Sequence, residues 1–198
     1  PLQTRLGIVG DGVALTSIEH PSRERYREPM YKLIVFIGYD ERQDLAYRTC
    51  KESILLNTEA DDEELSIRPL KLSTLREKGL YYRAANVDGQ GRRTDVIDGQ
   101  PFSTDFSFSR FLVPILVDRG ECPVAEWYMF VDSDFVFTDD IMKLLDEADP
   151  TKPISVVKHN YKQEGHETKK MDNQWQTPYN RKLWSSLMLY NNSAWQHK

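Results

Sequence analysis

Apolar residues gather in short runs along the chain, and four of these runs predict strands that are buried on both faces. Continuous apolar, β-branched runs of this length are typical of strands in a parallel sheet covered on both sides. The runs are residues 32–38, 126–137, 153–157 and 187–190. A fifth segment, residues 65–72, alternates imperfectly between apolar and polar positions and predicts a further strand.

Apolar residues spaced by three or four positions predict helices between these strands. Two helices are expected at residues 41–56 and 73–78, the second closed by Gly79. A third has its apolar stripe at Phe108, Phe111, Leu112, Ile115 and Leu116, with a cap among residues 103–105. A fourth is expected after a Thr138 cap, with its apolar face at Ile141, Leu144, Leu145 and Ala148.

The alternation of strands and helices predicts an α/β domain with a mixed, mainly parallel sheet flanked by helices. We expect a single domain over residues 30–198, preceded by a segment of uncertain structure at residues 1–29. Residues 80–102 and 158–183 are polar, and each predicts a loop longer than a simple connection needs. We expect the first of these loops to be functional or mobile.

Charge and composition narrow the function classes. The chain has 31 acidic against 26 basic residues, a net charge of −5, which argues against bulk nucleic-acid binding. No apolar run approaches the roughly 20 residues that a transmembrane helix needs. The two cysteines, Cys50 and Cys122, suggest free thiols in a reducing compartment and therefore a cytoplasmic location.

The most informative motif is Asp132-Ser133-Asp134, at the carboxyl end of the apolar run at 126–131. Ligands of open α/β sheets bind beyond the carboxyl ends of strands, and two carboxylates at this spacing can converge on one hard cation. Carboxylates next to an apolar interior require compensation by a metal, an arginine or a helix N-terminus. Asp139 and Asp140, in contrast, are expected to be ordinary charges in the first turn of a helix.

Two further groups of residues are candidates for a ligand site. Arg110 lies beside the apolar stripe of its helix, so it is either a surface arginine or a cation that pairs with the carboxylates or with a ligand phosphate. The second polar loop combines Asp172, Asn173 and Gln174 with tryptophan and lysine. That composition fits a sugar site, and equally a solvated loop.

In this ordered set of segments, the chain resembles the GT-A glycosyltransferases, and within them the retaining family 8 and related bacterial glycosyltransferase-like proteins. The Asp-x-Asp motif after a buried strand is a hallmark of that fold. The stretches that carry the resemblance are residues 34–54 (IVFIGYDERQDLAYRTCKESI), 101–116 (PFSTDFSFSRFLVPIL), 127–137 (WYMFVDSDFVF), 156–161 (VVKHNY), 170–177 (KMDNQWQT) and 184–192 (WSSLMLYNN).

The resemblance implies a hexosyltransferase with a UDP-sugar donor, a glycan or other hydroxyl acceptor, and a retained anomeric configuration. Asp132 and Asp134 would bind Mn²⁺ or Mg²⁺ bridging the donor diphosphate. The nucleotide-sugar site would comprise Gly38, Tyr39, Asp40, Arg110, Asp132, Ser133, Asp134, Asp172, Asn173 and Gln174. Of these, residues 38–40 would line the nucleoside pocket and residues 172–174 would face the donor sugar or the acceptor. No catalytic residue is assigned.

The chain departs from family 8 in two places. Ser185-Ser186 stands where the family has Asn-Ser/Ala-Gly, and the family's third metal ligand, a histidine, belongs to a segment further downstream; His159 is a candidate substitute. We therefore expect a domain that lacks its C-terminal part, with weak or no activity. Two alternatives stay open: a haloacid-dehalogenase-like, Mg²⁺-dependent phosphatase, whose Asp-x-Asp-x-Val motif matches residues 132–136, and an inactive nucleotide-sugar-binding domain.

Overall fold

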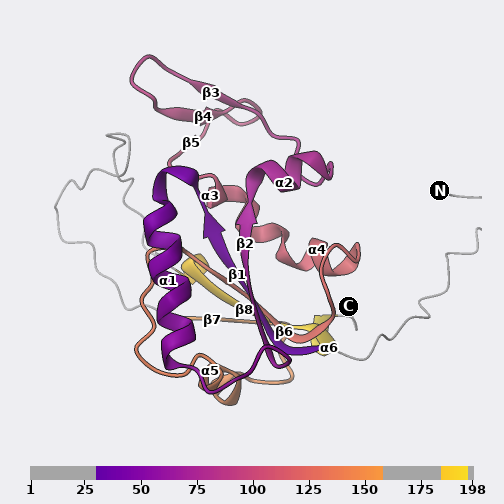
Figure 1. Ribbon diagram of the computed structural model, residues 1–198. Helices are drawn as coiled ribbons and strands as arrows, with labels where there is room; N and C mark the ends of the chain where they lie inside the picture. The colour runs from indigo at the N-terminus through magenta and orange to yellow at the C-terminus, as the bar shows by residue number, and fades with distance from the viewer. Residues whose placement is uncertain (1–29, 158–183, 196–198) are drawn as a thin grey trace, which may run out of the picture.

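The computed structural model describes residues 30–157 and 184–195, which form a mixed α/β domain around a five-stranded sheet (Figure 1). The strand order is β2-β1-β6-β8-β7. The strands are β1 (Tyr31–Tyr39), β2 (Leu65–Lys71), β6 (Ala125–Val131), β7 (Ile154–Val156) and β8 (Leu187–Asn191). Strands β2, β1 and β6 pair in parallel, whereas β8 is antiparallel to both of its neighbours. The predicted mixed, mainly parallel sheet is confirmed.

The three inner strands are buried as their apolar runs predict. Residues 33–38 of β1 and all five residues of β8 are buried, because helices cover one or both faces of the sheet at these positions. The strand predicted at residues 153–157 is confirmed as β7, but its predicted burial was wrong. Ile154 is 38% exposed and Val156 is 42% exposed, since β7 is an edge strand. Strand β2 forms the other edge, where Pro69 is tolerated because one side of the strand needs no partner.

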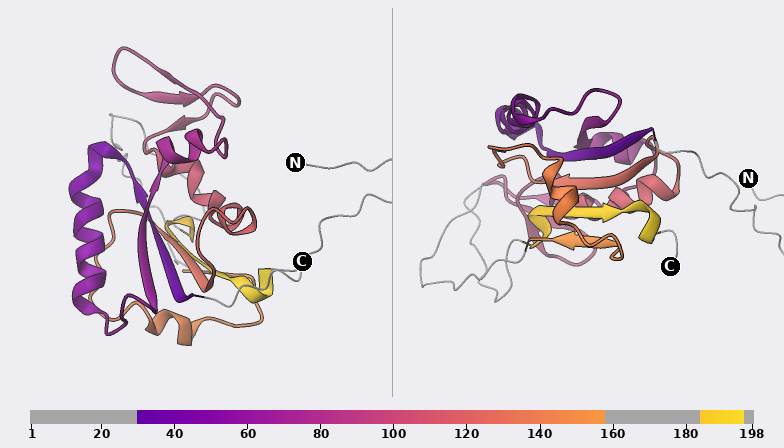
Figure 2. Two further views of the ribbon diagram at one scale, coloured as in Figure 1. Left: turned by 45° about the vertical axis from the view of Figure 1, so that its right-hand side comes forward. Right: turned by 90° about the horizontal axis from the view of Figure 1, so that it is seen from below.

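Helices cover both faces of the sheet and create two apolar cores, one on each side (Figures 1 and 2). Helix α1 and α5 pack on one side, and α2, α3 and α4 pack on the other. The helical segments are η1 (Glu41–Gln43), α1 (Asp44–Asn57), α2 (Leu72–Glu77), α3 (Phe106–Ser109), η2 (Arg110–Leu112), α4 (Val113–Asp118), α5 (Lys143–Glu147), η4 (Trp184–Ser186) and α6 (Asn192–Trp195). The helices predicted at 41–56 and 73–78 are confirmed to within one turn.

The two other helices differ from their predictions. The segment after residue 105 is divided into α3, η2 and α4, and this change of helical twist rotates the buried face. Phe106 and Val113 therefore enter the core, while Phe111 and Ile115 of the predicted stripe are exposed. After Thr138 the regular helix starts only at Lys143, so Thr138 does not cap it.

Residues 80–102, expected to be a loop, contain a second, three-stranded antiparallel sheet of order β3-β4-β5. Its strands are β3 (Ala85–Val87), β4 (Arg93–Asp95) and β5 (Pro101–Phe102). The guanidinium of Arg83 donates two hydrogen bonds of 2.8 Å to the buried carboxylate of Asp95. Local polar contacts, rather than an apolar pattern, hold this small sheet together, which is why the sequence did not reveal it.

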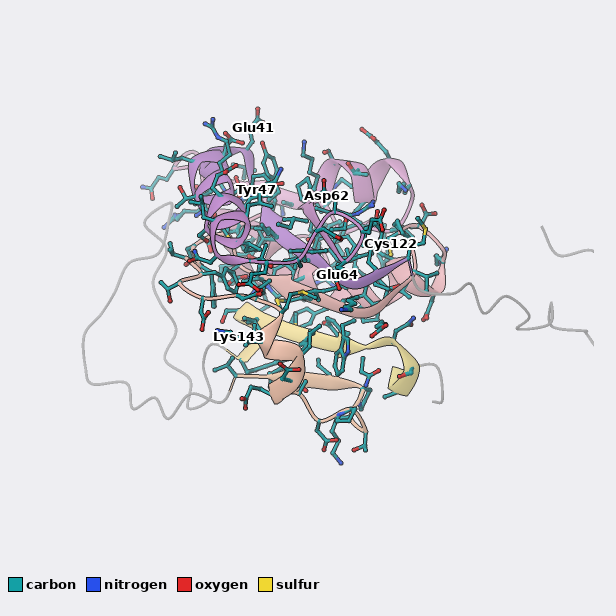
Figure 3. All side chains as sticks on the ribbon, turned by 60° about the horizontal axis from the view of Figure 1, so that its bottom comes forward. Glu41, Tyr47, Asp62, Glu64, Cys122 and Lys143 are labelled. Atoms are coloured by element: carbon teal, nitrogen blue, oxygen red, sulfur yellow. The ribbon has the colours of Figure 1, made fainter. Side chains whose placement is uncertain are left out.

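Both cysteines of the chain are free, as expected, and they lie on opposite sides of the main sheet. Cys50 is buried with α1 in one core, and Cys122, labelled in Figure 3, packs against the other. Among the helices of the described residues, none is long and apolar enough to cross a membrane.

Candidate functional site

The carboxyl ends of β1 and β6 meet at one edge of the sheet because the two strands are parallel neighbours. Ile37 pairs with Val131 there, and Leu187, the first residue of the antiparallel β8, pairs with Val131 from the other side. The residues that follow β1 and β6, and those that precede β8, therefore gather at this edge. In Figure 1 the arrowhead of β1 points toward it, next to α3 and below the small sheet.

Asp132, the first residue after β6, is paired with Arg110 of η2. Arg110 Nη1 donates a hydrogen bond of 3.2 Å to Asp132 Oδ2 and lies 2.9 Å from Oδ1. The guanidinium also donates to the carbonyl oxygens of Ser185 (3.0 Å) and Phe106 (3.2 Å). Arg110 thus pairs with one carboxylate of the motif, that of Asp132, and it is no ordinary surface residue, since its side chain is only 12% exposed.

The pKa of the Asp132 carboxyl group is raised above its ordinary value. Burial raises its pKa to about 6, the Arg110 guanidinium opposes this rise, and the charge of Asp134 adds to it. Although Oδ1 is buried and close to Arg110, no described residue donates a hydrogen bond to it. A buried carboxylate oxygen without a hydrogen bond is unfavourable, which makes Oδ1 the atom of this edge most suited to receive a ligand.

The two residues after Asp132 point in different directions. Ser133 is buried, and its Oγ lies 3.5 Å from Oε1 of Gln43, at the start of α1. Asp134 is exposed to solvent. The motif therefore presents one partly buried and one exposed carboxylate, which is the kind of pair that can hold a hard cation whose other ligands are water or phosphate oxygens.

Within the described part of the chain, no group of three or more His, Cys, Asp or Glu residues could hold a metal by itself. Asp132, whose Oδ1 receives no hydrogen bond from the described residues, and the exposed Asp134 are oxygen donors of the type that a divalent cation takes, and their binding of one stays a prediction. His159, considered above as a further ligand, lies outside the described residues.

Asp40, which follows β1, has the opposite environment. Its buried carboxylate accepts hydrogen bonds from Arg42 Nε (3.0 Å) and Nη2 (2.7 Å), from Arg93 Nη2 (3.3 Å), and from the backbone N–H of Arg42 (3.0 Å) and Asp105 (3.1 Å). Burial alone would raise the pKa of Asp40, but these hydrogen bonds lower it to about 2. Asp40 thus joins β1, the small sheet and the start of α3, and it stays ionised.

Gly38 and Tyr39 are the last two residues of β1. A Cβ atom on Gly38 would lie 2.6 Å from Cγ of Phe106, so glycine lets α3 approach the strand. The Tyr39 hydroxyl donates to Asp44 Oδ1 (3.2 Å), and Lys71 Nζ lies 4.8 Å from the centroid of its ring. The predicted participation of residues 38–40 in a nucleoside pocket stays a prediction.

Some residues of this site were not predicted from the sequence, and others that were predicted lie outside the residues that the structure describes. Three groups that contact the site residues were not predicted: the carbonyl of Ser185, the ring of Phe106 and the guanidinium of Arg93. Backbone carbonyls and contacts between distant segments leave no signal in a sequence. Asp172, Asn173 and Gln174 lie outside the described residues.

Asp139 and Asp140 make local contacts, but they precede α5 and do not lie in its first turn as predicted, because the helix begins only at Lys143. Asp139 forms an ion pair with Lys143 (2.7 Å), which Figure 3 labels on α5. Asp140 Oδ1 accepts from the backbone N–H of Met142 (2.9 Å).

No known protein-family profile matches the sequence. The chain is 44% identical over 157 residues to Protein CDI of Arabidopsis thaliana, an alignment that covers 79% of this chain and 52% of that protein. The chain thus spans about half the length of this curated relative. Among solved structures it is similar to the apo form of mouse xyloside xylosyltransferase 1, with a TM-score of 0.44 and 12% identity over 84% of this chain and 68% of the other.

Proposed function

We propose that this chain forms the nucleotide-sugar-binding domain of a metal-dependent glycosyltransferase with a GT-A fold, resembling family 8. The observation that carries the proposal is the carboxylate of Asp132. It stands at the carboxyl end of a central strand with a pKa raised to about 6 by burial, a buried Oδ1 that receives no hydrogen bond from the described residues, and Asp134 beside it. The carboxylate of Asp40, which has a structural role, differs because both of its oxygens accept hydrogen bonds.

Asp132 and Asp134 would hold Mn²⁺ or Mg²⁺ in this proposal, and the diphosphate of a UDP-sugar would complete the shell. When bound, such a cation neutralises the negative charge that develops on a diphosphate leaving group. Two protein carboxylates fit this role, since cations that bind phosphates commonly take only one or two ligands from the protein.

Arg110 would provide the second positive charge at the diphosphate. Its guanidinium is fixed by the carbonyls of Phe106 and Ser185, and it lies 5.2 Å from the ring centroid of Phe130. These contacts hold the guanidinium in place even when Asp132 turns toward another cation. A preorganised arginine favours phosphate oxygens, because its N–H groups match their geometry.

In the proposed reaction the bond between the anomeric carbon and the diphosphate oxygen breaks, and a bond forms from the anomeric carbon to an acceptor hydroxyl oxygen. The hydroxyl proton is released and the nucleoside diphosphate leaves with the bonding electrons. Gly38 and Tyr39 would line the nucleoside pocket, with Asp40 holding the loop in place, and residues 172–174 would face the sugar. Retention of configuration follows from the family resemblance.

The test is calorimetric titration of the 198-residue chain with UDP in the presence and absence of Mn²⁺. We expect Mn²⁺-dependent binding that Asp132→Asn and Asp134→Asn each weaken about tenfold or more, because each removes a charged oxygen ligand. The matched control is Asp139→Asn, an exposed carboxylate paired with Lys143, which leaves the affinity unchanged. A wild-type chain that binds no UDP with Mn²⁺ would overturn the proposal.

Two activity assays separate the alternatives. Hydrolysis of UDP-glucose or UDP-galactose by the same chain supports a transferase. Metal-dependent UDP binding without any hydrolysis favours a binding domain that does not turn over. Turnover of p-nitrophenyl phosphate without hydrolysis of UDP-sugars favours the phosphatase.

A further inference from the structure

Two exposed aromatic side chains lie in contact beside the candidate site. Phe111 belongs to η2 and Trp184 to η4, segments far apart in the sequence. Their ring centroids are 6.0 Å apart with planes inclined by 42°. Phe111 is 46% exposed and Trp184 is 44% exposed, so each residue keeps close to half of its surface open to solvent.

The position of this aromatic pair is set by the arginine of the site. Arg110 directly precedes Phe111, and Ser185 directly follows Trp184. The hydrogen bond from Arg110 Nη1 to the Ser185 carbonyl, 3.0 Å long, therefore ties the two aromatic residues together. The same Nη1 contacts Asp132, so Arg110, Ser185 and Asp132 form one charged centre. Phe111 directly follows Arg110 and Trp184 directly precedes Ser185, so each aromatic residue is one position away from this centre along its own segment.

The packing of the core does not explain why these two rings are exposed. Burial of a phenylalanine side chain is favourable, and nearby Phe106 and Phe130 are buried in the core. Single exposed aromatic residues are ordinary, and Tyr82, 84% exposed on the small-sheet side, is one of them. Phe111 and Trp184 differ because their rings lie in contact with each other.

We propose that Phe111 and Trp184 form the acceptor subsite, a platform on which one pyranose ring of the acceptor stacks with its apolar C–H face. This inference rests on the proposed function, because a transferase needs a hydroxyl acceptor next to the donor phosphate. The two rings offer flat apolar surface with one hydrogen-bond donor, the indole N–H, which suits a sugar face and not an anion. Arg110, which directly precedes Phe111, contacts Asp132, so the platform adjoins the charged centre along the chain.

The experiment is saturation-transfer NMR of the 198-residue chain with methyl β-D-glucopyranoside, methyl β-D-galactopyranoside and methyl β-D-xylopyranoside. We expect transfer from at least one glycoside. Trp184→Ala and Phe111→Ala should each weaken that binding about tenfold, since loss of one aromatic contact of ~1.4 kcal/mol is a tenfold change. Trp184→Phe keeps a ring and should retain most of the signal, and Tyr82→Ala is the matched control with unchanged transfer.

The remaining outcomes separate this subsite from the donor site. If the wild-type chain binds a glycoside through these residues but binds no UDP with Mn²⁺, the proposed function fails and the sugar platform stands. The platform is overturned if no glycoside gives transfer, or if Trp184→Ala and Phe111→Ala behave like Tyr82→Ala. It is also overturned if sedimentation shows self-association of the wild-type chain that Trp184→Ala abolishes, because a second copy then covers the rings.

Discussion

Asp40 and Asp132 follow neighbouring parallel strands, yet their carboxyl groups have opposite electrostatic environments. Hydrogen bonds from Arg42, Arg93 and the Asp105 N–H outweigh burial at Asp40, so its pKa falls to about 2. At Asp132, burial outweighs the single arginine, so its pKa rises to about 6. The ionised Asp40 carboxylate thus contributes to the stability of the fold, whereas ionisation of Asp132 reduces it.

The first prediction concerns Asp132→Asn. A folded-state pKa above the usual value means that the native protein takes up a proton more readily than the unfolded chain. The wild type should therefore lose stability as the pH rises from about 4 to about 6. The variant lacks this loss, so its free energy of unfolding, relative to wild type, should improve by about 1–3 kcal/mol between pH 4 and pH 7. Urea denaturation at both pH values measures the difference, and a difference that does not change with pH contradicts the prediction.

The same pKa predicts how metal binding depends on pH. A protonated carboxyl group is a poor ligand for a cation, so the affinity of the chain for Mn²⁺ with UDP should fall as the pH decreases through about 6. Calorimetric titrations at several pH values between 5 and 8 test this. An affinity that stays constant over that range would show that Asp132 is not a ligand.

The third prediction concerns Asp40→Asn. Because the pKa of Asp40 is lowered to about 2, its stabilising contribution is present above the unfolded-state value of about 4 and is lost as the pH falls toward 2. The substitution should lower the free energy of unfolding at pH 7 by about 2–4 kcal/mol, since it leaves two arginines with a neutral partner. Asp139→Asn, which breaks an exposed ion pair, should leave the free energy of unfolding almost unchanged.

At the scale of elements, the site depends on how closely α3 and η2 approach the end of β1. The ring of Phe106 lies where a side chain on Gly38 would be, and Phe106 in turn lies under the guanidinium of Arg110, 5.5 Å from its ring centroid. The small sheet is tied to the same place, because Arg93 of β4 contacts Asp40 and Asp105. A change at the end of β1 is therefore transmitted to Arg110 by direct packing.

Gly38→Ala is the prediction at this scale. Its Cβ would lie 2.6 Å from the Phe106 ring, so the ring or α3 must move, at a cost of about 1–3 kcal/mol in the free energy of unfolding. Phe106→Leu in the same chain should recover part of this loss. The control is Gly89→Ala, where no atom lies within 4 Å of the added Cβ, and where urea denaturation should show almost no change.

At the scale of the whole molecule, one sheet separates two apolar cores, and each core contains one cysteine. Burial raises the pKa of Cys50 to about 12 and that of Cys122 to about 11, so both thiols stay protonated at neutral pH in the folded chain. The thiols thus report separately on the two sides of the sheet.

Because both cores rest on the same five strands, we expect the two sides to unfold together. Alkylation by iodoacetamide at increasing urea concentration, with each cysteine followed by mass spectrometry, should give the same midpoint for Cys50 and Cys122. Different midpoints would show that one helical layer detaches before the other.

The sequence by itself determined the inner strands, because residues 32–38, 126–131 and 187–190 are apolar on both faces and only a covered sheet accommodates such runs. It also determined that the Asp132-Ser133-Asp134 motif follows a central strand. The tertiary structure alone decided that β7 is an exposed edge, that residues 85–102 form a small sheet, and that Phe111 faces solvent. It also decided the opposite pKa shifts of Asp40 and Asp132, because a pKa depends on burial and on partners from distant segments.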